Sequence, residues 1–164
     1  MMTRHQMRES VFLLTFERIF NGDPLDSIVE TAKECETVEI DDRVLDWVTG
    51  IDEKKAEIDQ EITKHLKNWT LARISKVSLA VLRVAVYELL FVDDMETNVS
   101  ISEAVKIAQE YSTKEDVAFV NGVLRKASHE NSVFGDRYQQ LYYFCGRLAF
   151  NGGACTVPKT AFAC

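Results

Sequence analysis

The stretch VSLAVLRVAVYELLF, residues 77–91, decides the fold class of this 164-residue chain. Its apolar residues cover nearly every side of a helical wheel, which is typical of a central helix enclosed by other helices. Two charged residues, Arg83 and Glu88, interrupt this pattern, and buried charges need partners. We therefore expect a helical core here, with an ion pair between Arg83 and Glu103 across the bundle.

Helical spacing continues outward from this stretch in both directions. Apolar residues recur with the helical period from residue 3 to about 128, and prolines occur only at positions 24 and 158. We expect an all-α protein of about six to seven helices in two small bundles packed together, one over 1–68 and one over 69–131. The expected helices run over about 3–20, 24–35, 41–66, 77–91, 100–111 and 116–127.

Local signals give the expected helix ends. Gly22 suits a C-terminal cap, and Asp23 suits an N-cap with Pro24 at the first helical position. Ser100 and Glu103 have the spacing of a capping box, in which two side chains satisfy free backbone N–H groups. The segment 112–116 offers a second cap for the last helix.

Composition excludes several classes of function. The net charge of −7 argues against non-specific coating of nucleic acid, although it allows a small basic site. The chain has no apolar run of membrane-spanning length and no signal peptide, so we expect a cytoplasmic protein without membrane contact. The four cysteines lack metal-ligand spacing, and we find neither a glycine-rich phosphate loop nor a recognisable catalytic pair. We expect a non-enzymatic protein without cofactor or metal.

Residues 132–164 differ from the rest of the chain in composition. They hold three of the four cysteines, four of the seven glycines and one of the 26 acidic residues. We interpret them as an atypical C-terminal extension of the helical bundles.

The stretch AFVNGVLRKA, residues 118–127, places a turn-forming Asn-Gly pair inside a helical pattern. On a helical wheel Val120, Val123, Leu124 and Ala127 share one arc with Phe119 at its edge, and the opposite arc is polar or small. The opposite arc consists of Ala118, Asn121, Gly122, Arg125 and Lys126. Either a neighbouring helix packs against Gly122, or this arc is a ligand surface that approaches the backbone closely.

The N-terminal helix carries a small cationic cluster. Arg4 and Arg8 are four residues apart on one face, with His5 beside Arg4, and the free N–H groups at a helix start also favour anions. The cluster is either a phosphate site or a solvated helix end. The apolar residues further along this helix spread more widely than one core requires, which indicates either complete burial or a protein partner.

Four motifs together resemble the NusB family of bacterial transcription antitermination factors. AVLRVAVYELL (80–90), VSISEAVKIAQEYS (99–112) and AFVNGVLRKA (118–127) resemble its C-terminal half in the same order, and TRHQMRESVFLLTF (3–16) resembles its arginine-rich first helix. The resemblance implies an RNA-binding subunit of two helical bundles that catalyses no reaction. Such a subunit binds the boxA element of nascent ribosomal RNA transcripts, as single strand, together with the ribosomal protein NusE. The complex then joins RNA polymerase and prevents early termination.

The resemblance also implies site residues. Partner contacts would lie at Phe16, Phe20 and Ser78. This chain has His5, Gln6 and Met7 where the family usually has arginines, so we expect weaker RNA binding and a shallower salt dependence. RNA contacts implied by the resemblance would lie at Arg4, His5, Arg8, Lys114, Glu115, Phe119 and Asn121. If the outer arc of the last helix is a ligand surface, Gly122 and Arg125 would join them.

This mechanism requires the helix start near residue 4 and the helix near residue 120 to lie side by side in one shallow, cationic groove. Two alternatives use the same residues differently. One is a protein-interaction module or homodimer with weakened RNA binding, which works through the apolar first helix. The other is the NusB-like RNA-binding part of an rRNA methyltransferase, which would need a separate catalytic domain.

Overall fold

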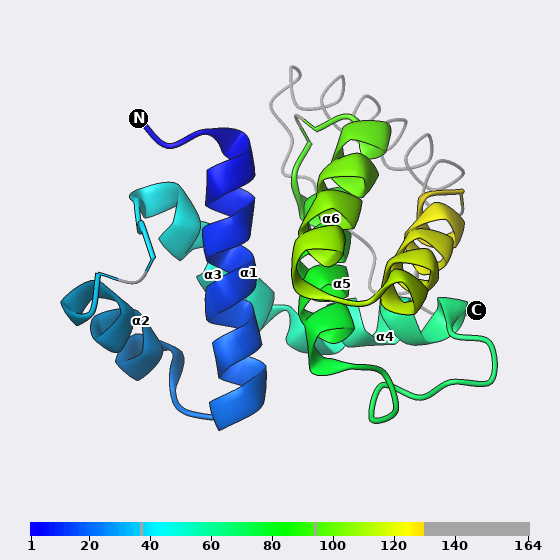
Figure 1. Cartoon of the computed structure of the whole chain (residues 1–164), viewed down its shortest axis with the longest axis horizontal. Helices are drawn as coiled ribbons and strands as arrows, with labels where there is room; N and C mark the ends of the chain where they lie inside the picture. The colour runs from blue at the N-terminus through cyan, green and yellow to red at the C-terminus, as the bar shows by residue number, and fades with distance from the viewer. Residues whose placement is uncertain (37, 94, 130–164) are drawn as a thin grey trace, which may run out of the picture. The chain divides into compact units, whose positions relative to one another are not determined.

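The computed structural model describes residues 1–36, 38–93 and 95–129, and every regular element in these ranges is a helix (Figure 1). This confirms the all-α fold class and the expected number of helices. Residues 1–129 form one compact unit, while the extension lies outside the described residues and the division at residue 68 stays a prediction. The helices are α1 (Arg4–Asn21), α2 (Leu25–Glu34), α3 (Asp42–Glu53), α4 (Lys55–His65), α5 (Lys76–Phe91), α6 (Thr97–Tyr111) and a last helix over 114–129.

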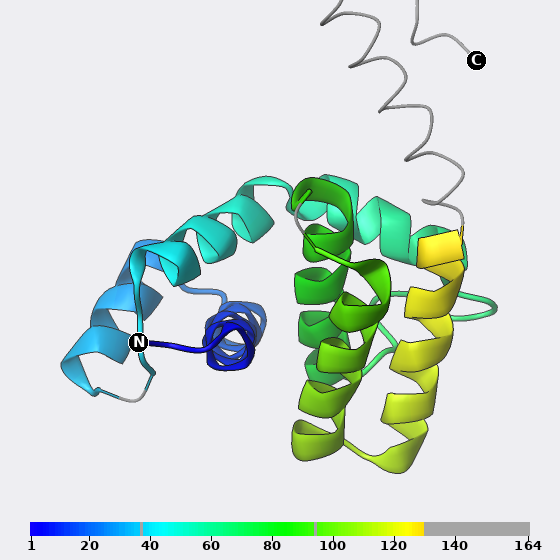
Figure 2. The ribbon, with the colours of Figure 1, turned by 90° about the horizontal axis from the view of Figure 1, so that it is seen from above.

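Helix α5 is the centre of the fold, as its apolar wheel predicts. All its residues from Ser78 to Val86 are buried, and Leu82 is completely enclosed. The helices α1, α3, α4 and α6 all contact it, and Figure 2 shows α6 alongside α5. Burying one large apolar side chain contributes about 1.5–3 kcal/mol to the free energy of folding. Because α5 buries several such side chains, it supplies much of the stability of the core.

Helix α1 packs against the central helix α5 and also against α2 and α3. Its N-cap is Thr3, whose side chain accepts a hydrogen bond from the backbone N–H of Gln6, while the Gln6 side chain accepts one from Thr3. Its C-cap is Gly22 with a φ of 74°, a left-handed conformation that glycine adopts without steric cost. Between these caps α1 buries Val11, Leu14 and other apolar residues against α2, α3 and α5.

Two expected helix starts are wrong. Pro24 rather than Asp23 occupies the N-cap of α2, and no side chain caps that end. Helix α6 begins one turn earlier than expected, at Thr97, so Ser100 is a buried residue inside the helix. The Ser100 N–H already bonds the carbonyl of Glu96 at 3.1 Å, so it needs no capping side chain.

The expected helix over 41–66 is two helices. The chain breaks at Lys54, which ends α3 and begins α4 with φ −96° and ψ 13°. The break lets α3 pack on α1 while α4 packs on α5, an arrangement that one straight rod would not give. Apolar spacing continues across the break, with Ile51 and Ile58 both buried, and therefore conceals it.

Candidate nucleic-acid interface

The start of α1 presents one free cation and one paired ring to solvent. Arg4 is exposed, and among the described residues it makes no ion pair; its Nη1 lies 3.4 Å from the sulfur of Met95. The ring of His5 is 40% exposed, and its Nδ1 lies 2.6 Å from Oε2 of Glu103 on α6. The positive end of the helix dipole adds to the charge of Arg4, which makes this helix end suitable for an anion.

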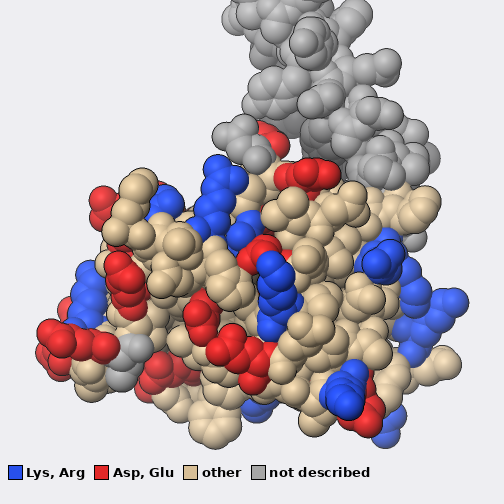
Figure 3. Space-filling model, turned by 45° about the horizontal axis from the view of Figure 1, so that its top comes forward, with Lys and Arg blue, Asp and Glu red and all other residues tan. Residues whose placement is uncertain are grey.

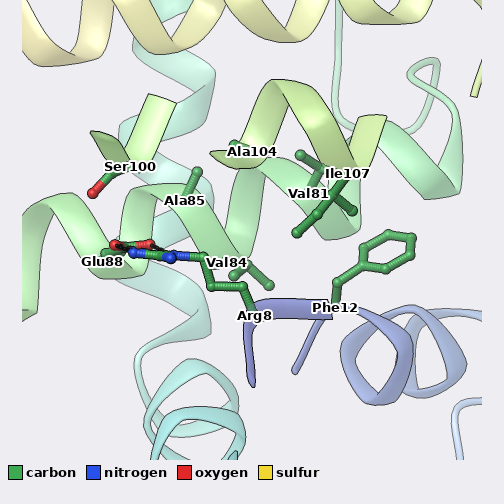
Figure 4. Close-up of a pocket in the computed structure, with 9 residues that line it drawn as sticks. All are labelled: Arg8, Phe12, Val81, Val84, Ala85, Glu88, Ser100, Ala104 and Ile107. Carbon is green, nitrogen blue, oxygen red and sulfur yellow. Dashed lines mark hydrogen bonds and ion pairs between the residues drawn. The ribbon is translucent and has the colours of Figure 1, made fainter. Parts of the chain in front are cut away.

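Arg8 does not join Arg4 at the surface, contrary to the expectation. Its Nη2 lies 2.6 Å and its Nε 2.9 Å from the two carboxylate oxygens of Glu88 on α5, and both side chains are at least 96% buried. Figure 4 shows this pair at the junction of α1, α5 and α6, beside a cavity of about 10 Å³. Because α5 covers Arg8 and its charge is already paired, its guanidinium cannot contact RNA in this conformation.

The expected ion pair between Arg83 and Glu103 is also wrong. Arg83 donates two hydrogen bonds of 2.8 Å to Asp59 on α4. Glu103 instead accepts from Lys106 at 2.6 Å and faces His5. Burial raises the pKa of Glu103, but the hydrogen bonds with Lys106 and His5 outweigh it and leave this pKa below its ordinary value of 4.5.

The last helix divides as its wheel predicts. Val120, Val123, Leu124 and Ala127 are buried, whereas the opposite arc is exposed or half-buried. On that arc Nε of Arg125 donates to Oδ1 of Asn121 at 3.1 Å.

Gly122 has open space beside it. No described atom outside its own helix backbone lies within 4 Å of the position that a Cβ would occupy. The interpretation that a neighbouring helix packs against Gly122 is therefore wrong within the described residues, and the outer arc stays open to a ligand. Lys114 and Glu115, at the start of the same helix, are exposed.

Phe119 contacts a residue that the sequence analysis missed. It is half-buried, and its ring centroid lies 6.1 Å from that of Trp69, in the segment between α4 and α5. Trp69 is 52% exposed. The available signal was an aromatic residue within a stretch that lacks acidic residues, between Glu61 and Glu88.

The two predicted contact regions do not lie side by side. In Figures 1 and 2, α5 and α6 lie between α1 and the helix over 114–129. The expected single groove is thus wrong, because α6 occupies the place where the two helices would meet. On the left of Figure 3 positive and negative side chains are interspersed, whereas positive ones prevail on the right, where α4 and the last helix lie.

The predicted partner residues separate into exposed and buried ones. The rings of Phe12, Phe16 and Phe20 follow one another along α1 with centroids about 6 Å apart, and Phe20 is 67% exposed. Ser78 is 1% exposed, and its Oγ lies at hydrogen-bond distance, 2.9 Å, from Oγ of Ser75. Ser78 therefore cannot face a partner in this conformation, because it lies on an enclosed part of α5.

Residues 5–129 match the sequence model of the NusB family. The chain belongs to this family. It is similar to the transcription antitermination protein NusB of Clostridium botulinum (strain Kyoto / Type A2), with 38% identity over 141 residues, covering 76% of this chain and 99% of that protein. The NusB protein of Oceanobacillus iheyensis is 39% identical over 125 residues, covering 76% and 98%.

Solved NusB structures share the fold. T. maritima NusB superposes with a TM-score of 0.70 at 37% identity, over 79% of this chain and 94% of that one. A chain from a crystal structure of the antitermination factors NusB and NusE with double-stranded RNA gives a TM-score of 0.70 at 25% identity, over 77% and 96%.

Family membership decides the class of protein. NusB antitermination factors are non-enzymatic, which confirms that expectation and argues against the methyltransferase alternative. Within the described ranges no helix is long and apolar enough to cross a membrane, and no group of three His, Cys, Asp or Glu side chains could hold a metal ion.

Proposed function

We propose that this NusB-family protein binds single-stranded boxA-type RNA of nascent ribosomal RNA transcripts together with NusE, and that the complex joins RNA polymerase and prevents early termination. The observation that carries the proposal is the exposed Arg4 at the positive end of α1, which has no ion pair among the described residues of a chain with net charge −7. The solved complex of NusB and NusE with double-stranded RNA supports RNA and NusE as ligands, and the single-stranded boxA form of the RNA follows from the family resemblance. Such an encounter takes place in the cytoplasm.

The RNA contacts fall into two regions separated by α6. Arg4 and His5 hold phosphates at the start of α1. On the last helix Lys114, Asn121 and Arg125 supply polar contacts, Glu115 accepts from base amino groups, and Gly122 lets the RNA approach the backbone, while Phe119 packs against a base. An RNA that contacts both regions crosses α6, whose surface carries Lys106.

NusE is assigned to the other end of α1. Phe16 and Phe20 continue the aromatic row beyond the core, and an exposed phenylalanine row is more typical of a protein interface than of a solvated helix. The RNA end and the NusE end of α1 are therefore distinct and can be occupied together.

A titration tests the proposal. Labelled boxA-type and scrambled single-stranded RNA are titrated at two salt concentrations, with and without NusE. We expect tighter binding of the boxA-type RNA and a further gain with NusE. Equally weak binding of both RNAs, unaffected by NusE, contradicts the proposal.

An arginine variant and a matched control identify the phosphate contact. Arg4→Ala should weaken RNA binding and reduce the slope of log K against log salt by about 0.7, the value of one single-strand phosphate contact. Arg43→Ala removes the same charge from an arginine that already pairs with Asp41 at 2.7 Å. That control should bind RNA like the wild type.

The second candidate function is a protein-interaction module or homodimer. The observation that favours it is the 67% exposed Phe20, together with the burial of Arg8, which removes one expected phosphate contact. If the module is correct, Arg4→Ala changes nothing, whereas Phe20→Ala abolishes binding of the partner or self-association in analytical ultracentrifugation.

A further inference from the structure

The segment between α4 and α5 holds an aromatic residue in an unusual position. Tryptophan is highly buried on average, yet Trp69 is 52% exposed. It follows Asn68, whose φ of 59° is left-handed, a conformation that asparagine adopts more readily than most residues. The ring of Trp69 is tilted 57° from that of Phe119 at 6.1 Å, so the two form one aromatic surface that is still partly open.

The surroundings of Trp69 in the sequence are positive. Residues 62–87 contain no aspartate or glutamate, although the chain has 26 acidic residues in all. Lys67, Arg73 and Lys76 lie in this stretch; all three are exposed, and no ion pair to them occurs in the part of the chain that the structure describes. On an acidic protein such a stretch is selective for a negatively charged ligand.

A hydrogen bond connects this segment to the last helix. Oγ of Ser75 donates to Oδ2 of Asp116 at 3.3 Å, close to the exposed Lys114. Together with the contact between Trp69 and Phe119, it joins the segment to the last helix at two points. Two acidic residues lie at the start of the last helix. The carboxylate of Asp116 is half-buried and already engaged by Ser75, whereas Glu115 is exposed.

We propose that Trp69 and Phe119 form a platform on which an unpaired base of single-stranded RNA stacks, while Lys67 and Arg73 contact the adjoining phosphates. Aromatic side chains between cations are the general means of binding single strands, because every base has a π-face and every linkage a phosphate. A protein partner would not need a stretch free of acidic residues. The inference rests on the proposed function and extends its contact surface beyond the last helix.

Two substitutions at one position separate stacking from packing. Trp69→Phe keeps a ring, whereas Trp69→Leu keeps apolar bulk against Phe119 and loses the π-face. We expect Trp69→Leu to raise the Kd for labelled boxA-type single-stranded RNA between about 5-fold and about 150-fold, the range for the loss of one stacked base. Trp69→Phe should stay within about threefold of the wild type.

A duplex provides the third arm. In the same RNA annealed to its complement, the bases stack on one another and cannot reach Trp69, so Trp69→Leu should leave the duplex Kd unchanged. An equal loss for duplex and single strand means that Trp69 acts through the fold and overturns the inference.

Fluorescence gives a readout that does not depend on the stability of a Trp69 variant. The chain has two tryptophans, and Trp47→Phe leaves Trp69 as the only one. Its emission should be quenched by the single strand and unchanged by the duplex. If the wild type binds no RNA, the proposed function itself is contradicted. If the wild type binds RNA but the emission of Trp69 is not quenched, only the platform is overturned. The same holds if the Trp69→Leu variant binds as tightly as the wild type.

Discussion

Arg4 and Arg8 lie four residues apart on α1, yet their surroundings differ completely. Arg4 is exposed at the helix end, whereas Arg8 is 3% exposed and forms a bidentate ion pair with Glu88. Removing one partner of a buried pair leaves an uncompensated charge, whereas replacing both with apolar residues is often nearly neutral. One arginine of α1 therefore lies at the surface, where it can contact a ligand, and the other lies in the core, where it stabilises the packing of α1 against α5.

This pair yields the first prediction. Arg8→Met should lower the free energy of unfolding by about 3–5 kcal/mol, because Glu88 stays buried without a partner. The double variant Arg8→Met with Glu88→Leu should recover most of that loss, as measured by denaturant unfolding. A single variant as stable as the wild type would mean that the pair contributes nothing.

The partners of the buried charged residues could not be predicted from the sequence. Arg83 and Glu88 each required a partner of opposite charge, but the identity of that partner depends on which helices touch, and no local pattern encodes that. The sequence therefore assigned Arg83 to Glu103 and Arg8 to RNA, whereas packing gives Arg83 to Asp59 and Arg8 to Glu88. The prediction that Ser78 faces a partner was wrong for the same reason, since Ser78 lies on an enclosed part of α5.

At the scale of elements, α1 and α6 are joined by a tyrosine. The hydroxyl of Tyr111 donates to Glu9 at 2.6 Å. That hydrogen bond, with partial burial and the negative charges of Glu9 and Glu110, raises the pKa of Tyr111 from 10 to about 12. Because the folded-state pKa is raised, the contact stabilises the fold below pH 10 and this stabilisation is lost as the pH rises from about 10 to about 12.

The second prediction follows from that contact. Subtracting the ultraviolet pH titration of a Tyr111→Phe variant from that of the wild type should isolate one phenol that ionises near pH 12. Glu9→Gln should move this pKa back toward 10. An isolated phenol that already titrates near 10 in the wild type would show that the hydrogen bond does not persist in solution.

The last helix gives a third prediction through Gly122. Alanine at this position has open space for its Cβ and removes most of the cost of glycine in a helix, so Gly122→Ala should raise stability by about 0.5–1 kcal/mol. If RNA approaches the backbone there, the same variant should bind boxA-type RNA more weakly. Thermal unfolding and the RNA titration measure the two effects separately, and a loss of stability contradicts the first.

Elements were predicted better than their ends. Period and burial agree for α5, whose apolar residues are enclosed on nearly every side, and for the last helix, whose single apolar arc is buried. The break at Lys54 and the early start of α6 were missed, since a helix pattern persists across a kink and a serine suited to capping can equally lie inside a helix.

At the scale of the whole molecule, residues 1–129 form one compact unit, which is also the region that the family model matches from residue 5. A chain ending after residue 131 should therefore keep the thermal midpoint of the full chain within a few degrees. It should also keep the same RNA affinity. Loss of helical circular dichroism in the shortened chain would show that the extension belongs to the fold.

The arrangement of the site could be predicted only in part. The wheel identified the open arc of the last helix, and the first-helix motif identified Arg4. The separation of these two regions by α6 follows from the order in which helices pack, and the contact between Trp69 and Phe119 spans 50 positions of sequence. Such long-range neighbours leave no periodic signal.

The buried pair between Arg8 and Glu88 anchors α1 between the region assigned to RNA and the region assigned to NusE. The helix has 18 residues and is therefore about 27 Å long. A ligand that orders one end of such a rod reduces the entropy that a ligand at the other end must lose. Any increase in RNA affinity caused by NusE must then be matched by an equal increase in NusE affinity caused by RNA, because thermodynamic linkage is reciprocal.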